Sequence, residues 1–265
     1  MIMEYAINIE PLYPDLEFCE KIKRVKEAGF DGIEFWGWYG RDIEQIKKTC
    51  EENEVKVTAF CATSDYSMCD RENSDNAVNW VKETMQTAKY LRCSTLIVFP
   101  NHFTKYGAAD FRERYSHTEM AASIVHNLMI LAPILKKEGI TLLLEPLHNH
   151  GDDKGMSITH TREGADIVRT VDAPNIKLLC DFYHMQMMHG NLLTNLLTNM
   201  DIVPYVHIAD APDRFEPGTG EINYEFLLTE MKKSGFDGTV CYEFFPQGDT
   251  DTALKTVKEL SSKIG

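Results

Sequence analysis

Four segments in the second half of the chain have the apolar pattern of a buried strand and carry a residue that can bind a metal or move a proton. These segments are ITLLLEPLH, LLCDFYHMQ, VPYVHIAD and GTVCYEFFP. In this order they carry Glu145, Asp181, His207 and Glu243, which are 36, 26 and 36 residues apart. Each interval is about one strand plus one helix, so the four side chains are expected on neighbouring strands of a parallel barrel, converging at its carboxyl-terminal rim.

The alternation of side chains along a strand makes this prediction specific. If the four residues point into the barrel, the residues two positions earlier must also point inward and fill the layer below. Those residues are Leu143, Leu179, Tyr205 and Cys241. The residues one position earlier must face the surrounding helices, and they are Leu144, Cys180, Val206 and Tyr242.

Three carboxylates in one buried place repel one another, unless a proton or a cation joins them. Three carboxylates and one imidazole form a hard, oxygen-rich ligand set. Such a set suits Mn²⁺ or Mg²⁺, with Co²⁺ as a further option and Zn²⁺ less suited. A single acid at a strand end more often caps a helix or forms a rim ion pair. The prediction of one divalent metal ion therefore depends on the four residues together.

A site of this kind could isomerise a hydroxy-carbonyl compound. A base takes the proton beside the carbonyl group, an acid returns a proton to the neighbouring carbon, and a metal ion makes the C–H bond more acidic. Glu145 and Glu243 are the candidates for these two roles, in either order. Arg214 could bind a substrate carboxylate bidentately, or could pair with Asp213 or Glu216. Lys154 is expected to be an exposed loop lysine.

The elements that must position these residues can be read from the apolar pattern. Strand segments are predicted near residues 5–11, 32–38, 55–63, 95–100, 140–148, 176–184, 203–210 and 239–245, and amphipathic helical segments alternate with them. No glycine-rich phosphate loop follows the first strand, which disfavours an open nucleotide-binding sheet. The pattern predicts an α/β protein with one (β/α)8 TIM-barrel domain over residues 1–265.

The composition excludes several other classes of protein. A net charge of −14 argues against a nucleic-acid partner. The sequence contains no run of about 18 apolar residues, so no membrane-spanning helix is expected. The acidic N-terminal segment does not resemble a signal peptide. Seven dispersed cysteines without a CxxC motif favour reduced thiols and a cytoplasmic location. We therefore expect a small-molecule substrate, no nucleic acid and no membrane.

The motifs LLLEPL, CDFYHMQ, HIADAPDR, GTGEINY and CYEFFP together resemble the hydroxypyruvate isomerase branch of the xylose-isomerase-like TIM barrels, to which the ketose 3-epimerases are related. The resemblance covers roughly residues 140–248, and AGFDGIEFW extends it weakly into the first half. It implies a metal ion held by Glu145, Asp181, His207 and Glu243, with both glutamates transferring protons. It also implies substrate contacts from His184 and Arg214, and interconversion of hydroxypyruvate and tartronate semialdehyde. Members often pair, so the resemblance leaves a homo-oligomer open.

Some residues depart from that branch and keep other activities open. His207 stands where hydroxypyruvate isomerases often carry Gln, and His is typical of the epimerase branch. The segment EPLHNHGDDKGM also differs from the EPLN pattern expected there. The alternatives are a ketose or keto-sugar 3-epimerase, a lyase or dehydratase acting on a sugar-derived ketone, and a non-catalytic sugar-binding barrel. Trp36 and Trp38 could wall the pocket or pack under a loop.

Overall fold

The computed structural model describes residues 3–151 and 154–264. Eight parallel strands close into a barrel in the order β1-β10-β9-β8-β7-β4-β3-β2, which confirms the predicted (β/α)8 architecture. The barrel strands are β1 (Glu4–Asn8), β2 (Gly32–Phe35), β3 (Lys56–Cys61), β4 (Thr95–Val98), β7 (Thr141–Leu144), β8 (Ile176–Asp181), β9 (Tyr205–Ile208) and β10 (Thr239–Tyr242).

All eight barrel strands coincide with predicted segments, but each one ends earlier than its apolar pattern does. β7, for example, ends at Leu144, whereas the pattern extends to His148. The residues between the two points belong to the loops at the rim of the barrel. Glu145 and Glu243 are the first residues after β7 and β10, so they lie where strand geometry still sets their direction.

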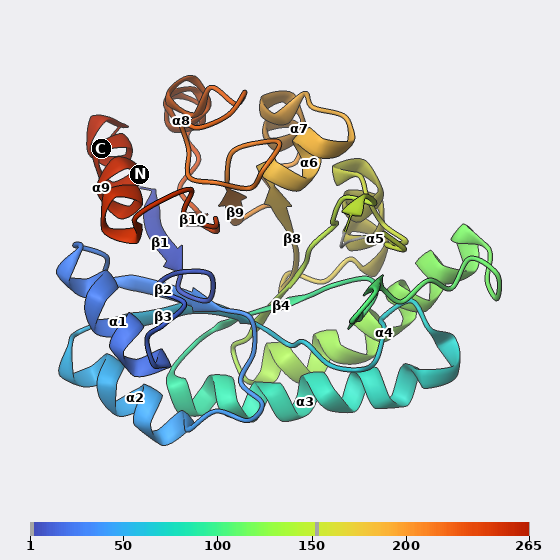
Figure 1. The fold of residues 1–265 in the computed structure, drawn as a ribbon. Coiled ribbons are helices and arrows are strands. Elements are labelled where there is room, and N and C mark those ends of the chain that lie inside the picture. Colours follow the sequence, from blue (N-terminus) through green and yellow to red (C-terminus); the bar gives the residue numbers. More distant parts are fainter. Residues whose placement is uncertain (1–2, 152–153, 265) are drawn as a thin grey trace.

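Helices surround the barrel in Figure 1, where the ends of the described chain lie close together beside β1 and α9. The α-helices are α1 (Phe18–Glu27), α2 (Ile43–Glu52), α3 (Ser74–Leu91), α4 (His117–Lys137), α5 (Thr161–Val171), α6 (Phe182–Met188), α7 (Leu192–Thr198), α8 (Tyr224–Lys233) and α9 (Thr250–Ile264), and a short 3₁₀ helix, η1 (Arg71–Asn73), precedes α3. Pairing of β1 with β10 brings the first and last strands together and closes the barrel.

The longest helix, α4, shows how local sequence sets an element. Ser116 and Glu119 form a capping box at its start, and Lys136 and Lys137 in its last turn complement the helix dipole. Pro133 lies inside this helix. By length and composition α4 could cross a membrane. In the structure it contacts α3 and α5 and buries one face, as a core helix does.

A two-stranded hairpin at the rim was not predicted. β5 (Phe103–Thr104) pairs with β6 (Gly107–Ala108) in the connection that follows β4. The Asn101 side chain accepts hydrogen bonds from the backbone and hydroxyl of Ser157 and donates one to the carbonyl oxygen of Ala109. These bonds tie the hairpin to the loop that follows β7, so both segments are held at the mouth of the barrel.

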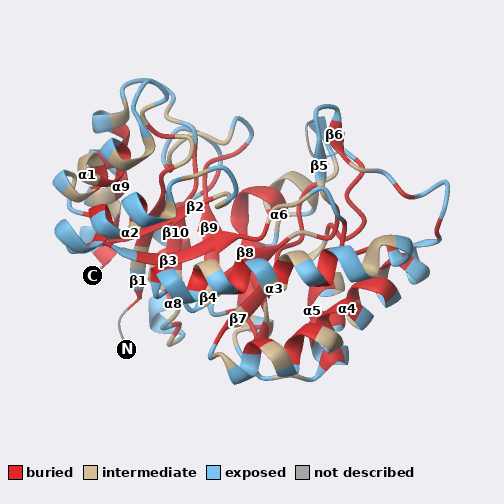
Figure 2. Cartoon of the chain, turned by 90° about the horizontal axis from the view of Figure 1, so that it is seen from below, coloured by how far each residue is buried: buried red, intermediate tan, exposed pale blue. Residues whose placement is uncertain are grey.

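The core has two layers, as the alternation predicted. Inside the barrel one cluster contains Ala6, Ala59, Cys61, Ile97, Leu143, Leu179, Tyr205 and Cys241. A larger cluster lies between the strands and the helices, and it includes Leu144, Cys180, Val206 and Tyr242. Figure 2 shows the barrel strands largely buried and the outer helix faces exposed. The predicted inward and outward positions are therefore confirmed for strands β7 to β10.

Candidate active site

The four acidic and imidazole side chains meet at the carboxyl-terminal rim of the barrel. Glu145, Asp181, His207 and Glu243 each offer a ligand atom, and these atoms all lie within 4.8 Å of one another. All four residues are buried, with between 1% and 5% of their surface exposed. Pairing of Asp181 with His207 across β8 and β9 sets part of this register. The structure thus brings together the residues that the sequence spacing placed on neighbouring strands.

Asp181 has two structural roles at once. Its Oδ1 atom accepts hydrogen bonds from the backbone N–H groups of Tyr183 and His184, at 2.7 and 3.2 Å, and so caps α6. Its Oδ2 atom lies 3.4 Å from the Nε2 atom of His184 and 4.0 Å from the Nδ1 atom of His207. A helix cap and membership of the cluster are therefore compatible, because each uses a different oxygen of the carboxylate.

The imidazole of His207 has carboxylates on both sides of its ring. Its Nδ1 atom lies 3.3 Å from Glu145 Oε1 and 3.0 Å from Glu243 Oε2. On the other side of the ring, Nε2 lies 2.9 Å from Glu34 Oε2. A carboxylate that accepts the Nε2 proton leaves the Nδ1 lone pair directed at the cluster, which is the tautomer that a metal ligand requires.

Two residues of this network were not predicted from the sequence. Glu34 is fully buried at the rim end of β2, and the Asn8 side chain donates hydrogen bonds to Glu34 Oε1 at 2.8 Å and to Glu243 Oε1 at 3.1 Å. Asn8 therefore links the partner of His207 to one of the cluster carboxylates. The available signal was an acid inside the apolar segment GIEFW, on the same face as Trp36.

Burial and neighbouring charges give the members of the cluster different proton affinities. Burial, opposed in part by His207, raises the pKa of Glu145 to about 8. Burial acts in the same direction on Glu243, but Arg214 and His207 outweigh it and lower the pKa of Glu243 to about 2. Burial disfavours the charged form of His207, yet Glu34, Glu243 and Glu145 raise its pKa well above the usual value. The metal-free cluster therefore retains protons that a cation would have to displace.

Arg214 lies against the cluster instead of pairing with its sequence neighbours. Its Nη2 atom is 2.8 Å from Glu243 Oε2 and 3.8 Å from Asp181 Oδ2, and its guanidinium group lies over the Tyr183 ring. The Arg214 backbone has a positive φ of 61° and donates a hydrogen bond to the carbonyl oxygen of Asp210. The Asp210 carboxylate accepts further bonds from the loop backbone, which hold the loop in this conformation.

A pocket of about 310 Å³ opens above the cluster. Its lining residues are Trp36, Thr63, Phe99, Phe103, Glu145, Leu147, His184, Arg214 and Glu243. Both glutamates and both predicted substrate-binding residues therefore reach the same cavity, which aromatic and aliphatic side chains also line. Lys154 is exposed and does not line the pocket.

The two tryptophans that follow β2 have different surroundings. Trp36 lines the pocket, and its indole N–H donates to Glu243 Oε1. Trp38 stacks on Trp80, with ring centroids 5.4 Å apart, and donates to Thr84 Oγ1 at 2.9 Å. The strand ends at Phe35, so strict alternation does not extend to Trp38.

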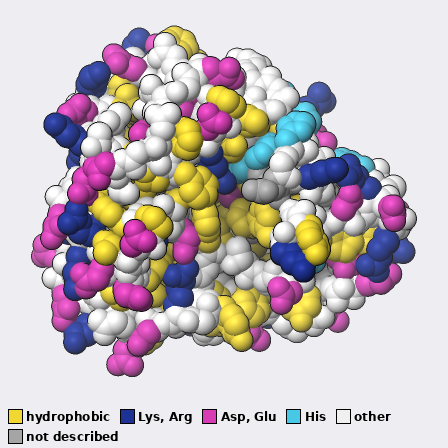
Figure 3. Space-filling view, viewed as in Figure 1, with side chains coloured by type: hydrophobic (Ala, Val, Ile, Leu, Met, Phe, Trp, Pro, Cys, Tyr) yellow, Lys and Arg dark blue, Asp and Glu magenta, His cyan; other side chains and the backbone are white. Residues whose placement is uncertain are grey.

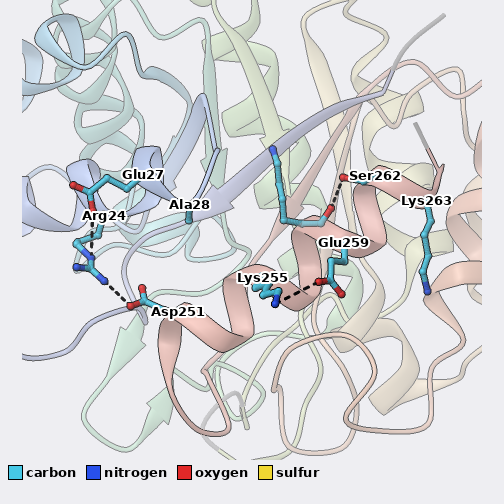
Figure 4. A pocket seen from close by; sticks show the side chains of 9 residues that line it. Arg24, Glu27, Ala28, Asp251, Lys255, Glu259, Ser262 and Lys263 are labelled. Carbon is cyan, nitrogen blue, oxygen red and sulfur yellow. Dashed lines mark hydrogen bonds and ion pairs between the residues drawn. The ribbon is translucent and has the colours of Figure 1, made fainter.

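A larger hollow of about 740 Å³ lies on the outside of the barrel, between α1 and α9 (Figure 4). Charged side chains line it, and several pair with one another, as Arg24 does with Asp251 and Lys255 with Glu259. None of the cluster residues reaches this hollow. The pocket above the cluster, although smaller, is therefore the candidate active site.

The residues of the cluster fit a divalent cation. The Nδ1 atom of His207 is buried and has no hydrogen-bond partner of acceptable geometry within residues 3–151 and 154–264. It faces carboxylate oxygens that would otherwise repel one another. Three oxygen donors and one imidazole nitrogen are a suitable set for Mn²⁺ or Mg²⁺.

A closed parallel barrel with buried carboxylates and an imidazole gathered at one rim pocket is the arrangement that a barrel enzyme uses. The sequence matches the family model described as xylose isomerase-like TIM barrel over residues 22–260. The chain belongs to this family, and it is an enzyme of the isomerase class.

Individual relatives agree with this assignment. The chain is 30% identical to the hydroxypyruvate isomerase of Escherichia coli over 261 residues, which cover 96% of this chain and 98% of that protein. It is 24% identical to the 2-oxo-tetronate isomerase of Pectobacterium atrosepticum over 259 residues, or 95% of each protein. A solved structure described as an AP endonuclease, family 2, from Brucella melitensis superposes with a TM-score of 0.85. That pair is 26% identical, over 97% of this chain and 99% of that one.

Lys and Arg side chains do not form a continuous basic area on the face shown in Figure 3, where they are interspersed with Asp and Glu. This distribution accords with the net charge of −14.

Proposed function

We propose that this chain is a divalent-metal-dependent isomerase that moves a proton between adjacent carbons of a small hydroxy-carbonyl compound. Hydroxypyruvate, or a related short 2-oxo acid, is the proposed substrate, in line with the names of the relatives. The observation that carries the proposal is the presence of two buried glutamates, Glu145 and Glu243, in one pocket with His207 Nδ1 and Asp181 between them.

The chain's own residues account for the proton steps. One glutamate takes the proton from the hydroxyl-bearing carbon, and the electron pair forms the C=C bond of an enediolate whose negative charge is on the former carbonyl oxygen. The other glutamate returns a proton to the former carbonyl carbon, while the hydroxyl proton passes to the former carbonyl oxygen and leaves the new C=O bond. The two carbons exchange oxidation state, so no external oxidant or reductant is needed. A divalent cation held by Glu145, Asp181, His207 and Glu243 would supply Lewis acidity toward the substrate oxygens.

Arg214 and His184 are the proposed substrate contacts. Arg214 can give two parallel N–H donors to a carboxylate, and its place over the Tyr183 ring fixes the plane of the guanidinium group. His184 lines the same pocket from α6. A substrate carboxylate near Arg214 would leave the carbonyl and hydroxyl groups directed at the cluster.

A ketose 3-epimerase is the second candidate. Trp36, Phe99 and Phe103 wall the pocket, and aromatic faces suit the C–H face of a sugar. A volume of about 310 Å³ is at the small end of ligand pockets, which span about 300–1,000 Å³, and accommodates either kind of substrate. The same metal ligands and the same two glutamates would serve both reactions.

We propose a cytoplasmic location and a single domain as well. All seven cysteines are free thiols, which suits a reducing compartment. The proposed partner is the small-molecule substrate, and a homo-oligomer remains open.

The test is a substrate screen in D₂O. The protein is loaded with Mg²⁺ and incubated with hydroxypyruvate, 2-oxo-tetronate and five- and six-carbon ketoses, and proton NMR follows isomer formation and loss of C–H signal. We expect turnover of a 2-oxo acid, and complete loss of exchange in Glu145→Gln and Glu243→Gln. Glu221→Gln, at the rim but outside the pocket lining, is the matched control. Turnover of ketoses alone would favour the epimerase, and no exchange with any compound would refute both.

A further inference from the structure

Two buried histidines form a pair at the edge of the pocket. His148, in the loop after β7, lies edge to edge with His184 of α6, with ring centroids 4.9 Å apart and an angle of 27° between the ring planes. Their Nδ1 atoms are 2.6 Å apart. Only 7% of the surface of His148 and 1% of that of His184 is exposed. The loop that carries His148 is the segment EPLHNH, which the assignment of ligands and proton carriers does not use.

The contacts that His148 and His184 make with described residues indicate which nitrogen of His184 carries its proton. Two Nδ1 atoms at 2.6 Å can share a hydrogen bond only if one of them is protonated and the other is not. The backbone N–H of His148 also points at His184 Nδ1, at 3.4 Å, so this nitrogen is placed to accept. His148 is then the Nδ1–H donor, and the ring proton of His184 is on Nε2.

The other side of the His184 ring agrees with this assignment. Its Nε2 atom lies 3.4 Å from Asp181 Oδ2, and a carboxylate oxygen can only accept. His184 lines the pocket together with Arg214, which is also a pure donor. Among the described residues on this side of the pocket, His184 and Arg214 therefore both present N–H groups to a ligand.

We propose that His148 is a positioning residue that fixes His184 as the Nε2–H tautomer, so that His184 donates a hydrogen bond to a carbonyl or carboxylate oxygen of the substrate. The substrate part of this statement rests on the proposed function, whereas the tautomer does not. A donor at this place would stabilise negative charge that develops on a substrate oxygen. It also means that His184 is not the base that removes the carbon-bound proton.

Two substitutions of His148 separate its role as a hydrogen-bond donor from the packing of its ring. In His148→Asn, the Nδ2 atom stands one bond beyond Cγ, as Nδ1 does in histidine, so a donor toward His184 is retained. In His148→Phe, an aromatic ring is retained at a wider separation from His184, and the donor is lost. His150→Phe is the control, because His150 is an exposed neighbour on the same loop, with its ring 6.1 Å from that of His148.

The direct readout is the tautomer of His184 in metal-free protein labelled with ¹⁵N-histidine. Two-bond proton–nitrogen NMR spectra distinguish the two ring nitrogens, and loss of the signals in His184→Gln assigns them. We expect a bare Nδ1 and a protonated Nε2 in the wild type, in His148→Asn and in His150→Phe. In His148→Phe we expect a mixture of tautomers, with kcat/KM for the 2-oxo acid reduced about tenfold.

Several results would overturn the inference. A protonated Nδ1 on His184 in the wild type would do so, and so would identical His184 spectra in His148→Phe and the wild type. Equal loss of activity in His148→Asn and His148→Phe would show that only packing matters. Because the NMR readout needs neither metal nor substrate, a failed substrate screen would leave this test intact, and a wrong tautomer would leave the isomerase proposal intact.

Discussion

Replacing Glu34 by glutamine tests how the protein prepares His207 to bind a metal. Glu34 is fully buried, accepts from His207 Nε2 at 2.9 Å and receives the Asn8 side-chain amide at 2.8 Å. A glutamine has nearly the same shape but presents one N–H₂ group in place of an acceptor oxygen. Whichever way the amide is turned, one of these two hydrogen bonds is lost.

Asn8 cannot simply rotate to compensate. Its Oδ1 atom accepts the backbone N–H of Glu10 at 3.0 Å, and its amide also donates to Glu243. If the new N–H₂ group faces His207 instead, the imidazole must keep its lone pair on Nε2 and its proton on Nδ1. That tautomer cannot direct a lone pair at the cluster, so metal binding must first reverse it.

The size of the effect follows from the bond that is lost. A hydrogen bond to a charged group contributes about 1.5–3 kcal/mol and a neutral one about 0.5–1.5 kcal/mol, so the change costs about 1–1.5 kcal/mol. This corresponds to about tenfold weaker metal binding. It is at the low end of the roughly 10- to 100-fold losses in metal affinity that follow removal of a ligand's hydrogen-bond partner.

The assay is calorimetric titration of metal-free Glu34→Gln with Mn²⁺, with circular dichroism to confirm that the variant is folded. Glu4→Gln is the control, because Glu4 is exposed at the opposite end of the barrel. We expect about a tenfold increase in Kd for Glu34→Gln and none for the control. Wild-type affinity in a folded Glu34→Gln variant would refute the role assigned to this carboxylate.

Metal affinity should rise with pH from 6 through about 8, because burial raises the pKa of Glu145 to about 8 and the neighbouring carboxylates raise that of His207, so that protons compete with the cation in this range; titrations in buffers of different ionisation enthalpy should detect the released protons, and constant affinity from pH 6 to 8 would contradict this. In the native protein only Cys19 should react quickly with a thiol reagent, since the other six cysteines are buried; fast reaction of several thiols under native conditions would be the opposite result. Gly220→Ala should lower Tm and raise KM, because the added Cβ would stand 2.0 Å from the backbone carbonyl oxygen of Ala211, in the loop that carries Arg214. Gly248→Ala is the control and should change neither quantity, because a Cβ there meets nothing within 4 Å.

The parts of the fold that the sequence predicted correctly are those governed by periodicity. Leu143 points inward and Leu144 outward because strand geometry has a period of two, and a closed barrel gives every strand one lumen face and one helix face. The same rule placed Glu145 and Glu243 in the lumen, one position beyond their strands. Their roles as ligands and proton carriers remain predictions.

The parts that were not predicted depend on contacts between distant segments. Glu34 is 173 residues from His207, and Asn8 is 235 residues from Glu243. No local pattern encodes such pairs, because the closing of the barrel creates them. The hairpin at Phe103–Thr104 was missed for another reason: strands of two residues are too short to show alternation.

The sequence and the structure both place the His207 side chain at the carboxylate cluster, and the structure also gives the orientation of its ring. The sequence placed an imidazole at the rim and could not say which nitrogen faces the carboxylates. The structure directs Nδ1 at the cluster and Nε2 at Glu34. The Glu34 carboxylate thus sets the orientation of the His207 ring. The spacing of residues along the sequence contains no information about this orientation.

The most direct test of the proposed metal centre is an anomalous difference map from a crystal of this protein grown with Mn²⁺. We predict one strong peak at the rim of the barrel, in contact with carboxylate oxygens of Glu145, Asp181 and Glu243 and with the Nδ1 atom of His207. A map without a peak among these four side chains, at a manganese concentration that saturates binding in solution, would contradict the account.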